Sequence, residues 1–73
     1  MDTMTTYTDA RRCHEAACAE LYRSEQALHD AHQTGVDQWI TAAADGLHRS
    51  VLRERSAAAR VEAARVAHTG RAA

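Results

Sequence analysis

The chain has 73 residues, which allows one small domain near the lower size limit for independent folding. Its formal net charge is −1 and 45% of its residues are apolar, but much of that apolar content is alanine, which buries little surface. Because it contains no apolar run of about twenty residues and no secretory signal pattern, the sequence predicts a cytoplasmic protein that does not span a membrane.

The first predicted element is a helix over about residues 9–33. Thr8 is a suitable N-cap, Asp9 would place a negative charge in the first turn, and the polar residues 1–7 are expected to be frayed. The inward stripe of this helix has alternating spacings of three and four and comprises Tyr7, Ala10, His14, Ala17, Leu21, Ser24, Leu28 and Ala31. Small residues alternate with larger ones along the stripe, which permits a close helix contact but gives a thin core.

A turn is predicted over residues 34–37. Gly35 tolerates the left-handed backbone with which helices often end, and Asp37 is expected to accept hydrogen bonds from the free N–H groups that open the next helix. The alternative is one continuous helix with a drifting stripe. Extending the first stripe by sevens from Leu28 leads to Gly35 and Arg49, which makes a poor seam, so the turn is favoured.

The second helix is predicted over about residues 38–67, and its last turns should extend beyond the first helix. Its apolar half near the turn comprises Trp39, Ile40, Ala43, Leu47, Val51 and Leu52, and the apolar positions continue at Ala58 and Val61. Gly46 lies inside this helix and is interpreted as a kink or a close helix contact. The segment from His68 to Gly70 is the predicted stop, with Gly70 just after the C-cap.

These elements predict an all-α fold, an antiparallel two-helix hairpin that forms a single domain over residues 1–73. The large apolar side chains are too few for a stable monomeric hairpin, so we expect it to self-associate into a helical bundle. The expected assembly is a homodimer or homotetramer, with another protein as a possible alternative partner. The residues expected at the oligomer interface are Leu21, Leu28, Trp39, Ile40, Leu47 and Val51.

Charge is distributed unevenly, with a net −5 over residues 1–45 and +4 over residues 46–73. In an antiparallel hairpin this places the basic end beside Asp9, Glu15 and Glu20, which favours charge pairing. The alternative function is a small nucleic-acid-binding regulator whose phosphate contacts would be Arg49, Arg53 and Arg60. Glu54 and Glu62 interrupt this basic stripe and no helix-turn-helix pattern is present, so nucleic acid is the less favoured partner.

Two groups of residues have spacings that metal sites use. His14 and Cys18 share a helix face, and two such pairs in a symmetric dimer could form a four-ligand zinc site. Glu25, His29 and His32 can also project from one face. Because neither group has a second ligand pair in the chain, we expect a helix contact and a solvated face instead, with no metal and no cofactor. Cys13 and Cys18, five residues apart, lie on different faces and should not form a disulfide.

Catalysis finds no support in the sequence. The serines on the predicted helices lack a glycine-rich elbow, the cysteines lack a cationic setting, and no phosphate-binding loop is present. We therefore expect a non-enzymatic protein-interaction or regulatory module.

The segment Ala27–Ile40, followed by Ala44, Leu47 and His48, resembles a segment of short uncharacterised helical proteins of actinobacteria and their phages. The resemblance covers the turn and the beginning of the second helix. It implies a bacterial or phage origin and brings no activity with it.

Overall fold

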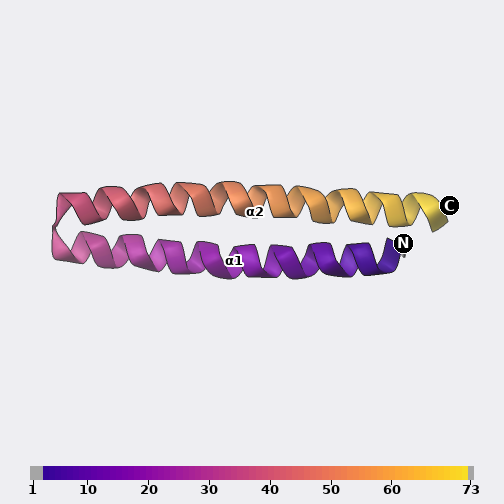
Figure 1. Ribbon diagram of the computed structural model, residues 1–73, viewed down its shortest axis with the longest axis horizontal. Helices are drawn as coiled ribbons and strands as arrows, with labels where there is room; N and C mark the ends of the chain where they lie inside the picture. The colour runs from indigo at the N-terminus through magenta and orange to yellow at the C-terminus, as the bar shows by residue number, and fades with distance from the viewer. Residues whose placement is uncertain (1–2, 73) are drawn as a thin grey trace.

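The computed structural model describes residues 3–72, with side chains over residues 6–70. It contains two helices, α1 (Thr3–Thr34) and α2 (Asp37–Ala72), and no strand within the described residues. The helices lie side by side and antiparallel, joined at one end by two residues (Figure 1). The molecule measures 55 × 16 × 13 Å, so it is a rod two helices wide. The prediction of an all-α helical hairpin is confirmed.

Both helices extend further at their outer ends than the sequence predicted. α1 begins at Thr3, so Thr8 lies inside the helix and is not its N-cap. α2 continues through Gly70, which has no positive φ, so the predicted stop at that glycine is wrong. A glycine costs a helix only about 1 kcal/mol, and no proline is present to end either helix. The outer end of α2 lies beyond that of α1, as expected (Figure 1). Residues 1, 2 and 73, which belong to the predicted frayed ends, lie outside the described residues.

The turn is shorter than predicted and depends on two residues. Gly35 has a φ of 71°, and its N–H donates to the His32 carbonyl over 3.3 Å, which closes α1. The Thr34 hydroxyl donates to the Ala31 carbonyl at 2.6 Å and accepts from the Val36 N–H at 3.2 Å. These contacts satisfy backbone groups that the helix ends leave free. The Gly35 prediction is confirmed, and the continuous helix is excluded.

Asp37 does not cap α2 as the sequence predicted. α2 begins at Asp37 itself, and the carbonyl of Val36 accepts the N–H groups of Trp39 and Ile40, each at 3.0 Å. Val36 therefore occupies the N-cap position without a side-chain oxygen to offer. Asp37 contributes a negative charge to the first turn, where the helix dipole favours it.

The two helices pack along a seam with heptad spacing. Every residue of the inward stripe predicted for α1 is buried or half-buried, so that prediction is confirmed. On α2 the seam comprises Ile40, Ala43, Leu47, Ser50, Glu54, Ala57, Val61 and Ala64. The sequence analysis found the larger apolar members and missed Ser50, Ala57 and Ala64. Leu52, which it placed in the apolar half of the helix, is 50% exposed.

Small residues form the most buried part of the seam. Ser24 and Ser50 meet across it, with 2.6 Å between their hydroxyl oxygens, and Ser50 is only 2% exposed. Seven residues further from the turn this register places Ala17 opposite Ala57, which is 5% exposed. Among the described side chains, the buried apolar ones are Ala31, Ala57 and Ala64. Over residues 6–70 the hairpin therefore packs small side chains at its centre and fully buries no large apolar one.

Gly46 does not provide a close helix contact. A methyl group placed on it would meet only the side chain of Arg49, 3.8 Å away, and no atom of α1 within 4 Å. α2 continues through this position as one helix. The interpretation of Gly46 as a contact glycine is therefore wrong.

Candidate metal centre and surrounding surfaces

Three potential metal ligands from the two helices meet at one edge of the seam. His14 and Cys18 are one helical turn apart on α1, and Glu54 reaches them from α2. His14 and Glu54 occupy heptad positions that Leu21, Leu28, Ile40 and Leu47 fill nearer the turn. Two ionisable residues thus replace apolar ones in the seam, one on each helix. We refer to His14, Cys18 and Glu54 as the metal-ligand cluster.

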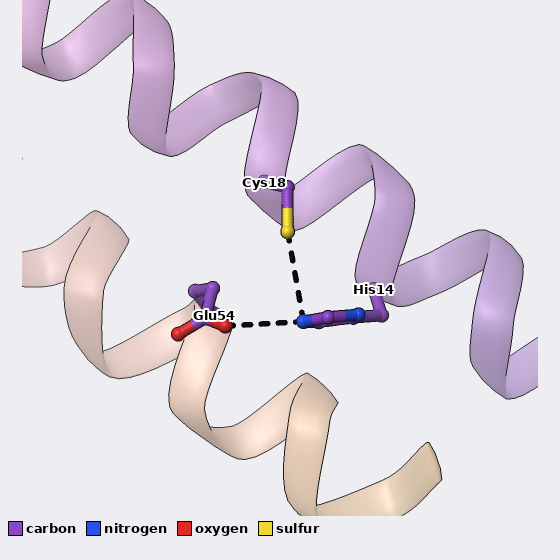
Figure 2. A group of neighbouring side chains, drawn as sticks. All are labelled: His14, Cys18 and Glu54. Carbon is purple, nitrogen blue, oxygen red and sulfur yellow. Dashed lines mark hydrogen bonds and ion pairs between the residues drawn. The ribbon is translucent and has the colours of Figure 1, made fainter.

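The cluster converges on a single nitrogen atom. His14 Nε2 lies 3.0 Å from Glu54 Oε1 and 3.5 Å from Cys18 Sγ (Figure 2). The three ligand atoms all lie within 4.8 Å of one another. In Figure 2 the imidazole edge points between the thiol and the carboxylate, and both interactions end at the same ring nitrogen. One donor from each residue is therefore available to a common centre.

The cluster is open to solvent on one side. The side chains of His14 and Glu54 are 32% and 26% exposed, and Cys18 is exposed. Sequence analysis correctly placed His14 and Cys18 on one face, but it did not bring Glu54 to them. Glu54 carries no such signal, because it lies on α2 and the register set by Ser24 and Ser50 places it about one heptad step along the seam from His14.

Cys13 lies away from the cluster, as the spacing of the two cysteines predicted, and both thiols are free. It lines a shallow groove of about 430 Å³ along the helix contact, together with Ala17 and Ala57, and Arg53 and Arg60 also line this groove. The groove continues past Cys13 and Arg60 toward the chain ends, where Ala10 and Ala64 line it. None of the lining residues belongs to the metal-ligand cluster.

The second group with metal-site spacing is not assembled. Glu25, His29 and His32 are all exposed on α1. Within the described residues they form no three-ligand group with one another or with α2. They lie on a solvated face, as expected.

Charge pairing between the helices is present at one of the three predicted acids. Glu20 accepts a hydrogen bond from the Arg53 guanidinium across the seam. Asp9 lines the same groove as Arg60, and Glu15 forms no ion pair within the part of the chain that the structure describes.

A further ion pair lies within α2 itself. Arg65 Nε donates to Glu62 Oε2 at 3.0 Å, and Arg65 Nη2 donates to Glu62 Oε1 at 2.5 Å. These hydrogen bonds, with the attraction between the charges, hold the pKa of Glu62 below its usual value and raise the pKa of Arg65. Both groups are exposed, so the pair adds little stability.

The residues predicted at the oligomer interface divide into two sets. Five of them are half-buried in the hairpin, leaving part of each side chain accessible: Leu21, Leu28, Ile40, Leu47 and Val51. Trp39, at the turn end, is 58% exposed. The three arginines considered for nucleic-acid contact, Arg49, Arg53 and Arg60, are exposed on α2, and Arg53 is engaged by Glu20.

Over the described residues, neither helix contains an apolar stretch sufficient to cross a membrane. Comparison with known proteins found no matching family model, no similar curated protein and no similar solved structure.

Proposed function

We propose that the chain is a small, non-enzymatic protein-interaction module that self-associates through the half-buried apolar side chains near the turn. One observation carries this proposal: among the described side chains, the hairpin fully buries only small ones and leaves every large apolar one partly exposed. Those side chains would be covered if a second hairpin packed against the first. A homodimer of hairpins is a four-helix bundle, in which shallow crossing angles bury such stripes.

Energetic considerations support association. Burying apolar surface stabilises a fold by roughly 25 cal/mol per Å², and an alanine contributes little area. Domains of this size have marginal stability unless disulfides, metals or oligomerisation support them. The described cysteines are free, so self-association is a direct route to further burial.

A substitution at Trp39 should impair association while leaving the fold of the hairpin intact. Its side chain is 58% exposed, so the hairpin depends little on it, yet an aromatic side chain near a contact often dominates binding. Leu52 is also exposed and apolar, but the proposed interface does not include it. The two residues form a matched pair of test positions on α2.

The experiment is light scattering after gel filtration over a hundredfold range of protein concentration. The expected result is a dimer or tetramer for the wild-type chain and for Leu52→Ser. Trp39→Ser should retain its helicity and shift toward the hairpin monomer at the low end of the range. A helical wild-type monomer at every concentration would refute self-association, and equal loss in both variants would refute the assigned interface.

A further inference from the structure

We propose that His14, Cys18 and Glu54 bind a zinc ion that links α1 to α2. The sequence alone led us to expect no metal, because it showed only the pair on α1. Glu54 supplies the third ligand from the other helix and reverses that expectation. The proposal concerns one hairpin and does not depend on how many hairpins associate.

Two of the separations in the cluster are close to the edges of a zinc tetrahedron. Zn–N and Zn–O bonds of about 2.0–2.1 Å and a Zn–S bond of about 2.3 Å separate neighbouring ligand atoms by about 3.3–3.6 Å. The observed separations from His14 Nε2 are 3.0 Å to the Glu54 oxygen and 3.5 Å to the Cys18 sulfur. The third separation, between the Cys18 sulfur and a Glu54 oxygen, is at most 4.8 Å, and side-chain rotation toward a common centre would bring all three atoms to one ion.

The contacts within the cluster also favour a cation over a proton. An imidazole nitrogen has one in-plane position, which holds either a hydrogen or a lone pair. The His14 Nε2 atom therefore makes one good hydrogen bond at a time, although both Glu54 and Cys18 point at it (Figure 2). A metal ion at that position interacts with all three residues at once.

The types of ligand select the metal. A thiolate, an imidazole and a carboxylate form a mixed set that suits zinc, whereas calcium and magnesium prefer oxygen ligands alone. Zinc binding displaces the thiol proton of Cys18 to solvent, so the ion is held by a thiolate. Because the cluster is open beside Cys18, water completes the fourth coordination position.

The position of the cluster gives the ion a structural consequence. His14 and Cys18 alone would bind a metal to one helix, but Glu54 makes the same ion a cross-link between α1 and α2. Zinc should therefore raise the melting temperature of the hairpin, because it binds the folded state more tightly than the unfolded chain. It would strengthen the part of the seam where the apolar side chains are smallest.

Cobalt(II) provides the direct test, because a thiolate bound to it produces charge-transfer absorption in the near ultraviolet. The full chain would be titrated with Co²⁺ in a buffer that contains a weakly chelating reductant. Zn²⁺ would then be added to compete with the bound cobalt. We expect this absorption to saturate at one cobalt per chain and to disappear when zinc is added. Absence of the band, or a band that survives in Cys18→Ser, would overturn the proposal.

Matched variants assign each ligand. Cys18→Ser, His14→Gln and Glu54→Gln should each weaken zinc affinity by at least about tenfold. Their controls, Cys13→Ser, His48→Gln and Glu62→Gln, remove the same group elsewhere and should bind like the wild type. Circular dichroism without metal shows which variants retain the hairpin.

Glu54→Gln decides whether the site spans the two helices. In this variant zinc should bind more weakly and should no longer raise the melting temperature. Equal affinity and an equal thermal shift would reduce the site to a pair on α1 and overturn the cross-link. Light scattering of the zinc-loaded chain gives its mass, which shows whether the thermal shift comes from one hairpin or from an assembly of several.

Discussion

The half of the hairpin near the turn and the half near the chain ends differ in the side chains that fill the seam between the helices. Near the turn, the large seam positions hold Leu21, Leu28, Ile40 and Leu47, and hydrogen bonds of Thr34 fix the end of α1 and the connector. Toward the chain ends, the corresponding positions include His14 and Glu54 between layers of alanine. We infer that apolar burial stabilises the first half, whereas close approach and polar contacts hold the second.

The same heptad spacing can therefore be stabilised in two ways, by burial of large apolar side chains or by close packing of small ones. Apolar area scales with side-chain size, so the turn half contributes most of the hydrophobic free energy. The outer half gains dispersion contacts between closely spaced backbones, and these contacts are sensitive to any added volume. Variants that act on one half alone can test this division.

Leu47→Asp should have the largest effect, because it places a charge in the apolar half of the seam. We expect a loss of at least about 3 kcal/mol, comparable with the whole stability of so small a chain. The variant should lose both helicity, measured by circular dichroism, and its assembled mass. Leu52→Asp is the control on the exposed side of α2, and equal damage from the two changes would contradict the seam assignment.

Ala57→Leu tests the outer half by adding volume at a buried alanine of the seam. Ala57 is 5% exposed in the seam, so we expect a loss of about 1–3 kcal/mol from overpacking. Thermal unfolding measures the change, and Ala59→Leu adds the same volume at an exposed position. A more stable Ala57→Leu variant would mean that this half is limited by missing apolar area instead.

The two glycines of the turn half should respond with opposite signs to the same added methyl group. Gly35→Ala introduces a side chain at a φ of 71° and should cost about 1 kcal/mol, although nothing lies within 4 Å of the new atom. Gly46→Ala meets only the end of the Arg49 side chain and should stabilise α2 by up to about 1 kcal/mol. Chemical denaturation of both variants measures the pair of effects. Stabilisation by Gly35→Ala would contradict the role of Gly35 in closing α1.

Arg60→Glu should have the smallest effect. Arg60 is exposed and lines the shallow groove along the helix contact, and surface changes of this kind usually alter stability by less than about 0.5 kcal/mol. The melting temperature and the assembled mass should therefore stay close to those of the wild type. Loss of assembly would show that the outer half belongs to the interface, against the division drawn above.

The sequence predicted the hairpin, the position of the turn and the full inner stripe of α1, because heptad spacing and a glycine between two helical segments are local signals. It missed Thr34 as the residue that links the helix ends, since its hydroxyl acts through backbone geometry that spacing does not reveal. It did not reveal Ser50, Ala57 and Ala64, because a small side chain in a seam has no hydrophobic signal that separates it from a small side chain on the surface.

The metal-ligand cluster was only half predictable. His14 and Cys18 are four residues apart, which a helix converts into neighbours without further information. Glu54 lies forty residues from His14 and meets it only when the two helices pack together. Placement of this kind depends on the alignment of the two helices, and small residues that recur every seven positions are compatible with more than one alignment.

The Ser24–Ser50 hydroxyl pair addresses that ambiguity. Because small residues recur every seven positions on both helices, sliding one helix by seven residues would again match small with small over most of the seam. Such a slip would separate the two serines and place each hydroxyl against alanine, where an unmet hydrogen bond costs about 1–3 kcal/mol. Serine is nearly as small as alanine, but its buried hydroxyl needs a hydrogen-bond partner on the opposite helix. One polar layer can therefore fix the alignment of two helices whose other small residues would accept several alignments.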